Sequence, residues 1–178
     1  MRPPSDLDQV ERLGFDYFEP PAVEVSTMTE AEFQAFKARV ATSRLRCRSF
    51  NSFIRTLRVV GPDVSAQALE VNLDSCLPRC PELGGEIVVW GSASSRNVPD
   101  GYPRGRAWAE IVRFLRMARD AACPNQLVIA IEPLSPPESD IINAAGEVLR
   151  LVRDVNHPNV RMMVDYYTRR HNYARVQS

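Results

Sequence analysis

Apolar residues along this chain follow two alternating patterns. The first consists of short runs rich in β-branched and aromatic residues, and three of these runs are continuously apolar instead of alternating with polar residues. Continuous apolar runs of this length are typical of strands that are covered on both faces, as in a parallel sheet. The strands predicted from these runs are residues 15–19, 45–51, 86–92, 127–132 and 160–167.

The second pattern lies between these runs, where apolar residues recur every three or four positions, as in an amphipathic helix. Thr29 and Glu32 predict a capping box at the start of one helix, while Gly14 and Pro78 stand where two others are expected to end. The alternation of strands and helices, with no linker between them, predicts one α/β domain with a parallel sheet. The predicted helices are residues 5–13, 29–40, 63–77, 107–122 and 140–155.

Charge and composition narrow the classes of partner. Lys and Arg together number 22, as do Asp and Glu, so the net charge is zero, which argues against a nucleic-acid or anionic-membrane partner. The sequence has neither a membrane-spanning apolar run nor the apolar core of a signal peptide, so we expect a cytoplasmic protein. Cys47, Cys76, Cys80 and Cys123 are then expected to be reduced structural thiols, not disulfide or zinc ligands.

Polar side chains stand at the ends of the predicted strands. Glu19, Asn51, Ser92, Glu132 and Asp165 occupy these positions, and the carboxyl ends of parallel strands meet at one rim of the sheet, where α/β proteins build their sites. We interpret Glu132 and Asp165 as a metal or acid/base site, with structural ion pairing as the alternative. Because no His or Cys lies nearby, these oxygens favour a hard ion such as Mg²⁺ or Mn²⁺.

Two further side chains are candidates for substrate contact. Glu138 follows a proline-rich turn and is predicted to bind a substrate hydroxyl, with a surface acid or a cap of the helix at 140 as the alternative. Arg96 follows the small residues 91–95, a pattern that suits a sugar or phosphate. The sequence contains neither G-x-G-x-x-G nor G-K-[ST], so it gives no support to a Rossmann or P-loop protein.

Four stretches together resemble the sugar phosphate isomerase/epimerase family, over about residues 6–168. They read "LGFDYFEPP", "GGEIVVWGSASSRNVPDGY", "IAIEPLSPPESDIIN" and "HPNVRMMVDYY". The members of that family are xylose isomerase-like TIM barrels, among them the tagatose and psicose 3-epimerases. Endonuclease IV barrels are related, but they bind zinc through several His, and this chain has two.

The resemblance implies roles for four acids. Glu132 and Asp165 match the first two of the family's four metal ligands, Glu138 matches a substrate-binding Glu, and Glu19 matches an acid at the pocket floor. The implied cofactor is a divalent metal, Mn²⁺ or Mg²⁺ first, with Co²⁺ or Zn²⁺ as alternatives. The implied ligand is a sugar or sugar phosphate.

The chain also departs from the family pattern. Thr168 stands where the family has a substrate-contacting His, and no counterpart is found for strands 1, 7 and 8 of the barrel. We therefore expect a partial (β/α)8 barrel of about five parallel strands, equivalent to strands 2–6, in a truncated domain at 1–168, followed by a divergent polar tail at 169–178. The open sheet edges predict homo-oligomers or aggregation.

The sequence therefore leads to two functional hypotheses. The first is a metal-dependent sugar or sugar phosphate isomerase or epimerase, in which Glu132 takes part in proton transfer next to a carbonyl through an enediolate, with doubtful activity for this chain alone. The alternative is a non-catalytic remnant that binds a sugar or a partner.

Overall fold

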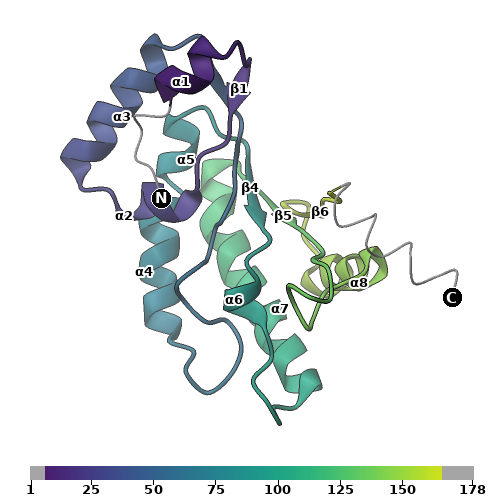
Figure 1. The fold of residues 1–178 in the computed structure, drawn as a ribbon. Coiled ribbons are helices and arrows are strands. Elements are labelled where there is room, and N and C mark those ends of the chain that lie inside the picture. The colour runs from purple at the N-terminus through teal and green to yellow at the C-terminus, as the bar shows by residue number, and fades with distance from the viewer. Residues whose placement is uncertain (1–6, 166–178) are drawn as a thin grey trace, which may run out of the picture.

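The computed structural model describes residues 7–165, and all of its strand pairs are parallel (Figure 1). The pair β1 (Tyr17–Phe18) and β2 (Arg46–Cys47) lies beside a four-stranded sheet. The order in that sheet is β3 (Ser49–Phe50), β4 (Ile87–Trp90), β5 (Val128–Ile131) and β6 (Val160–Met162). The predicted α/β class and the order of the parallel strands are confirmed.

The strand predicted at 45–51 is interrupted at Arg48. The amides of Glu86 and Ile87 both donate to the carbonyl oxygen of Arg48, at 2.8 and 3.2 Å, as in a β-bulge. The segment before this point pairs with β1 and the segment after it pairs with β4. An isolated bridge between Pro21 and Asn51 ties the two groups of strands together again at the carboxyl end.

Five helices confirm predicted ones. They are α1 (Leu7–Arg12), α3 (Glu30–Thr42), α4 (Ala66–Cys76), α7 (Arg104–Ala122) and α8 (Ala145–Val155). The predicted capping box is present, because the Thr29 amide donates to Glu32 Oε2 at 2.8 Å and the Glu32 amide donates to Thr29 Oγ1 at 3.3 Å. The short elements α2 (Ala22–Thr27), α5 (Arg79–Glu82), α6 (Ala93–Arg96) and a 3-10 turn (Cys123–Asn125) were not predicted.

Helix α8 begins five residues later than the predicted start at 140. The preceding residues form a loop in which the Asn143 side chain donates to the carbonyls of Leu134 and Ser139, at 2.9 and 2.7 Å. Ile142 has a left-handed φ of 62° there, which a helix does not tolerate and which is rare for a β-branched residue. The conformation and hydrogen bonds of this loop therefore prevent the helix from beginning at residue 140, where the sequence pattern predicted its start.

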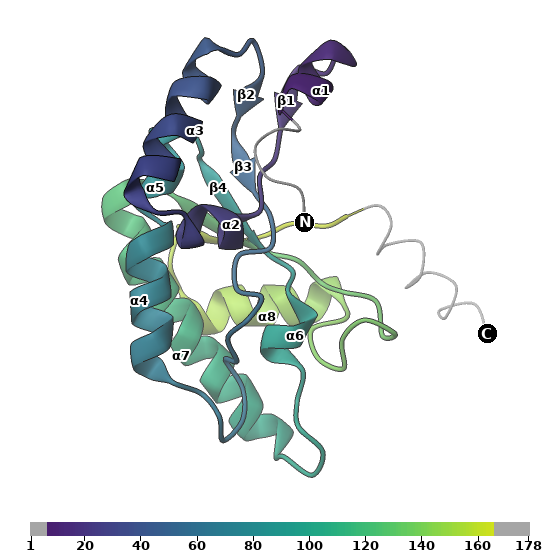
Figure 2. The same ribbon diagram turned by 60° about the vertical axis from the view of Figure 1, so that its left-hand side comes forward.

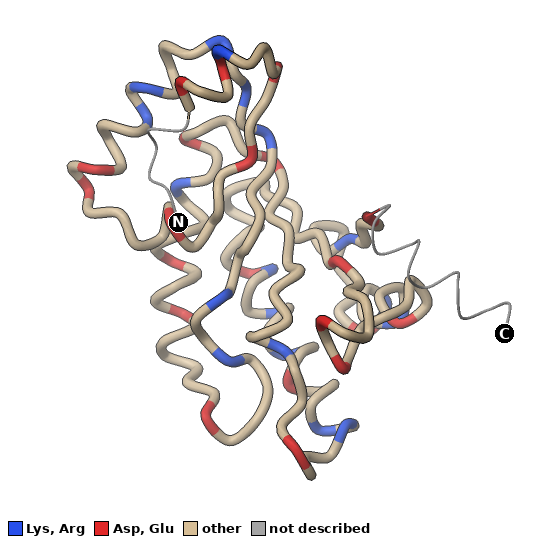
Figure 3. The backbone as a smooth tube through the Cα atoms, viewed as in Figure 1, with Lys and Arg blue, Asp and Glu red and all other residues tan. Residues whose placement is uncertain are grey.

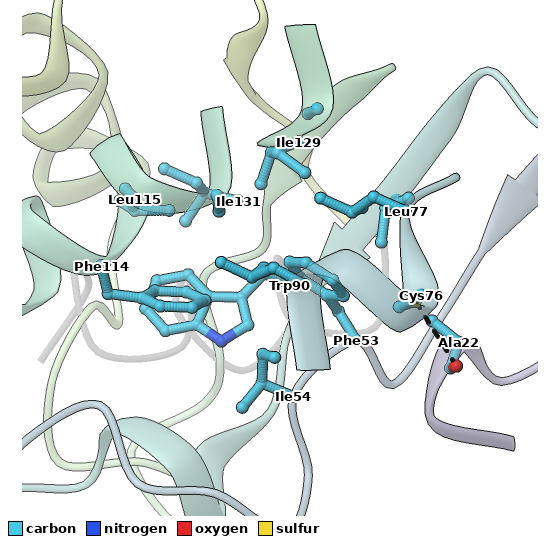
Figure 4. Close-up of a cluster of buried hydrophobic side chains, with 14 of the residues drawn as sticks. Ala22, Phe53, Ile54, Cys76, Leu77, Trp90, Phe114, Leu115, Ile129 and Ile131 are labelled. Atoms are coloured by element: carbon cyan, nitrogen blue, oxygen red, sulfur yellow. Dashed lines mark hydrogen bonds between the residues drawn. The ribbon is translucent and has the colours of Figure 1, made fainter. Parts of the chain in front are cut away.

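The core lies between the sheet and the helices on one of its sides (Figure 2). Trp90 of β4 is its largest fully buried side chain and packs on Phe114 of α7, with ring centroids 5.2 Å apart (Figure 4). Its indole Nε1 donates to Ser95 Oγ at 3.1 Å, so the ring carries no unpaired donor. Cys47, Cys76 and Cys80 are buried free thiols, whereas Cys123 is exposed.

The other face of the sheet corresponds to the interior of a barrel. Because side chains alternate along a strand, the residues between the core positions point to this inner face. Tyr17 is 68% exposed and Ile87 is 36% exposed. The described inner-face positions are Tyr17, Arg46, Ser49, Ile87, Val89, Val128, Ala130 and Arg161. Of these only Ala130 is buried, so the described residues leave most of this face uncovered.

Some sequence predictions fall outside the described residues. Strand β6 ends at Met162, the structure is described as far as Asp165, and Thr168 and the tail at 169–178 lie beyond it. Across residues 7–165, no helix combines the length and the apolar character that a membrane span requires. Association through sheet edges stays a prediction.

Candidate active site

The site is built where β4 and β5 end. Glu132 is the first residue after β5, and its amide donates to the Trp90 carbonyl at 3.2 Å, so the ladder continues one step past both strands. This places the Glu132 side chain directly over Gly91. A Cβ at position 91 would lie 1.9 Å from Glu132 Oε2, so only glycine leaves the carboxylate where it is.

A cleft of about 380 Å³ opens beside Glu132. It lies in the size range of small-molecule sites, ~300–1,000 Å³. Ser52, on its wall, has a left-handed φ of 50°, and backbone strain of this kind is concentrated at functional sites. The cleft is lined by Asn51, Ser52, Arg55, Val89, Gly91, Ser92, Ala93, Ser94 and Glu132.

The predicted carboxylates act on one another at this rim. Glu132 is half-buried, and its pKa is raised, first by that burial and then by the charge of Asp165. Glu138 and Glu19 raise the pKa further, and Arg96 opposes them. The structure therefore brings the four acids named from the sequence within electrostatic reach of one centre. Elsewhere acidic and basic residues are interspersed over the chain, in keeping with its zero net charge (Figure 3).

Arg96 lies behind the rim, in the wall of the site. Its side chain is 0% exposed, its Nη2 donates to the Glu132 carbonyl at 2.9 Å, and its guanidinium lies 5.3 Å from the Trp90 ring centroid. Burial lowers the pKa of Arg96 to about 10, against the opposing effect of Glu132. Among residues 7–165, Nε and Nη1 have no hydrogen-bond partner. Substrate contact by Arg96 stays a prediction and requires the covering residues to move.

Glu138 and Glu19 occupy exposed positions at the rim. Glu138 Oε2 accepts from the amide and the hydroxyl of Ser135, at 3.2 and 2.5 Å, so the carboxylate closes its own turn in this conformation and does not cap α8. The carbonyl of Glu19 accepts from Asn51 Nδ2 at 3.2 Å, which fixes the end of β1 against the end of β3. Their predicted substrate-binding roles remain predictions.

Glu132 and Asp165 are the kind of ligands that a hard divalent ion prefers, but two ligands are fewer than a metal site normally has. Glu132 and Asp165 offer carboxylate oxygens, which Mg²⁺ and Mn²⁺ prefer. Their mutual repulsion, expressed in the raised pKa of Glu132, is the kind of charge that a cation relieves. Within residues 7–165, however, no group of three or more Asp, Glu, His or Cys side chains is placed to hold a metal ion.

Sequence reasoning missed two features of the site. One is Gly91, whose lack of a side chain makes room for Glu132. The other is Arg55, which reaches the cleft from the loop after β3. No sequence pattern signals Arg55, because its place in the cleft depends on how the loop after β3 packs against α6.

The family is settled by a comparison with known protein families. Residues 7–168 match the family described as xylose isomerase-like TIM barrel. The chain belongs to this family. The resemblance inferred from the sequence is thereby confirmed, and so is the barrel fold class. None of the curated proteins matches the chain.

Solved structures show the same fold at low sequence identity. A D-psicose 3-epimerase solved in the presence of D-fructose has a TM-score of 0.81 at 20% identity, over 96% of this chain and 60% of that one. A D-psicose 3-epimerase with D-tagatose, from Clostridium cellulolyticum H10, has a TM-score of 0.79 at 19% identity, over 94% and 59%. The IolI protein with a bound zinc atom has a TM-score of 0.67 at 18% identity, over 92% and 58%. The chain thus spans about 60% of the length of the first of these proteins.

Proposed function

We propose that the rim around Glu132 is a metal-dependent sugar isomerase or epimerase site, which moves a proton next to a carbonyl group. The observation that carries this proposal is the placement of Glu132 over Gly91, where it is half-buried, within electrostatic reach of Asp165, and open to a cleft of about 380 Å³. Structures of similar fold were solved in the presence of D-fructose, with D-tagatose or with a bound zinc atom, which supports this class of ligand and cofactor.

In this proposal Glu132 and Asp165 hold the divalent ion. When bound, the ion supplies polarisation of the oxygens next to the carbon that loses its proton. Glu132 also holds or accepts the proton at its carboxylate, which reaches the cleft. Glu19 and Glu138 are proposed to bind substrate hydroxyls, and release of Glu138 from Ser135 would free its carboxylate for that purpose.

The alternative proposal is a protein that binds a sugar without turning it over. Its support is the incomplete ligand set within residues 7–165. Both proposals require a functional rim, so metal binding tests what they share, and turnover separates them. With two carboxylates as ligands, most coordination positions would be filled by water, so we expect weak affinity.

The experiment is titration of the full 178-residue chain with Mn²⁺, followed by the electron paramagnetic resonance signal of the free hydrated ion. Glu132→Gln and Asp165→Asn remove proposed ligands and should each reduce binding about tenfold or more. Gly91→Ala should do the same without touching a ligand, because its Cβ displaces the Glu132 carboxylate.

Gly146→Ala is the matched control for the glycine variant. A Cβ at position 146, in α8, meets nothing within 4 Å, so this change should leave Mn²⁺ affinity unaltered. Parent-like affinity in both the Glu132→Gln and Gly91→Ala chains would show that the rim is not the metal site.

A further inference from the structure

Arg55 gives the cleft a positive charge that the proposed reaction does not use. Among the described residues that line the cleft, it is the one with a cationic side chain, and it stands in the same cleft as Glu132. Its side chain is exposed, and within residues 7–165 its guanidinium has neither a hydrogen bond nor an ion pair. The guanidinium group of arginine can bind a carboxylate or a phosphate through two parallel hydrogen bonds.

The backbone of Arg55 is fixed although its side chain is not. Phe53 and Ile54, which precede it, are 0% and 1% exposed and belong to the core. The Ser94 hydroxyl of α6, on the other wall of the cleft, donates to the Arg55 carbonyl at 2.9 Å. The cation is therefore presented from a rigid support, which lowers the entropy cost of binding.

Arg58, three residues later, shows what a structural arginine looks like in the same loop. Its Nη1 donates to the Ser94 carbonyl at 3.3 Å, and its Nη2 donates to the Asn97 carbonyl at 2.5 Å. The Val59 amide adds a bond to the Ser95 carbonyl at 2.8 Å. Arg58 thus joins the loop after β3 to α6, and Arg55 is left to line the cleft.

Arg55 and Glu132 carry opposite charges, line the same cleft and do not pair with each other. Such a cleft suits a ligand with an anionic group at one end and neutral polar groups at the other. Among residues 7–165, Arg55 forms no ion pair with Glu132 or with another acid, and the cleft that both residues line has a volume of about 380 Å³. The acids at the rim disfavour an anion close to Glu132, so an anionic group is expected at the Arg55 end.

We propose that this cleft binds a sugar that carries an anionic group, either a phosphate monoester or a carboxylate, with Arg55 on the anion and Glu132 on the carbonyl and hydroxyl end. This inference rests on the proposed function, and it selects charged sugars over the neutral ketoses present in the similar psicose epimerase structures. Arg55 would act as the residue that determines this selectivity.

Calorimetric titration of the full chain in the presence of Mn²⁺ tests the proposal with four compounds: D-fructose, D-fructose 6-phosphate, D-glucuronate and inorganic phosphate. We expect an anionic sugar to bind at least tenfold more tightly than D-fructose. Arg55→Gln should reduce the affinity for that sugar about tenfold or more, because a hydrogen bond to a charged group is lost, and should leave D-fructose unaffected. Arg153→Gln, an exposed arginine of α8, is the matched control and should change neither.

The compounds separate the two sources of negative charge. Tighter binding of D-fructose 6-phosphate identifies a phosphate ester, and tighter binding of D-glucuronate identifies a carboxylate. Equal affinity for D-fructose and the anionic sugars, no loss in Arg55→Gln, or no binding of either anionic sugar overturns the inference. If Glu132→Gln still abolishes Mn²⁺ binding in that case, the proposed metal site stands while the charge selectivity falls.

Discussion

The two faces of the sheet differ in almost every physical respect. On the outer face, side chains such as Phe50, Trp90 and Ile129 are fully buried under helices and form one continuous core. On the inner face, Tyr17 is 68% exposed and Arg161 points to solvent. The carboxyl end of this inner face also carries the half-buried Glu132 and its acidic neighbours. The helix-covered face thus supplies the stability of the described residues, and the uncovered face carries the acids of the candidate site.

This division explains why the inner face keeps groups that a core does not tolerate. Uncompensated carboxylates cost free energy when they are buried, and a cation or a substrate can recover that cost on binding. On the outer face, by contrast, the largest buried side chain has its polar atom paired, because the Trp90 indole donates to Ser95 Oγ.

Replacement of an isoleucine by alanine should lower the free energy of unfolding much more on the outer face than on the inner face. Ile129 on the outer face is 0% exposed, and Ile129→Ala should lower the free energy of unfolding by about 2–5 kcal/mol through a cavity in the core. Ile87 on the inner face is 36% exposed, and Ile87→Ala should cost less than about 1 kcal/mol. Urea unfolding followed by circular dichroism measures both. Equal losses would mean that the inner face is packed in solution, by association or by residues outside 7–165.

Arg96 lies between the two regions, since it is buried like a core residue and charged like a rim residue. Arg96→Met keeps the volume and removes a guanidinium with two unpartnered nitrogens, at the expense of the bond to the Glu132 carbonyl. Replacing buried charges by apolar groups stabilises proteins by up to about 4 kcal/mol, so we expect a gain of about 1 kcal/mol or more. The exposed Arg153→Met is the control and should change stability by no more than about 0.5 kcal/mol. A loss above about 2 kcal/mol in Arg96→Met would show that the guanidinium is fully paired in solution.

The sequence predicted the outer face better than the inner one, for a physical reason. Apolar periodicity records burial, so it located β4, β5 and the long helix α7 with errors of a few residues. It also located Glu132, because an acid directly after a buried strand interrupts that pattern. The resemblance noted in the sequence pointed to the same rim, and the roles of its residues stay predictions.

What the sequence did not predict depends on particular hydrogen bonds and packing contacts, which the apolar periodicity does not record. The bulge at Arg48 arises from two amides of the next strand, and the late start of α8 arises from bonds of Asn143 within a loop. Burial of Arg96 could not be expected either, because an arginine after five small residues reads as an exposed side chain. Arg55 was missed because its position in the cleft depends on how the loop after β3 packs against α6.

The reactivity of cysteine thiols on the two faces should differ strongly, and measuring it requires almost no change in the stability of the chain. Cys47 lies on the outer face of β2, and burial, with a smaller effect of Glu19, raises its pKa to about 12. The thiolate is the reactive form, so at pH 8 a group with this pKa reacts on the order of 1,000-fold more slowly than an ordinary thiol of pKa about 8.5. A cysteine placed on the inner face by Val89→Cys, where the side chain is half-buried, should react much closer to the ordinary rate.

The measurement is labelling by 5,5′-dithiobis(2-nitrobenzoate) in a Cys123→Ser background, which removes the exposed native thiol. The sign of the pH dependence follows from the raised pKa: the folded chain holds the Cys47 proton more tightly than the unfolded chain, so its contribution to stability is complete below pH 9 and is lost as the pH rises from 9.0 toward about 12. Slow labelling of Cys47 that accelerates only in this window, beside rapid labelling at position 89, is the expected result. Comparable labelling rates of the two cysteines at pH 8 would contradict the prediction. They would mean that the reagent reaches the outer face of the sheet as readily as the inner face, although the side chains on the outer face are buried.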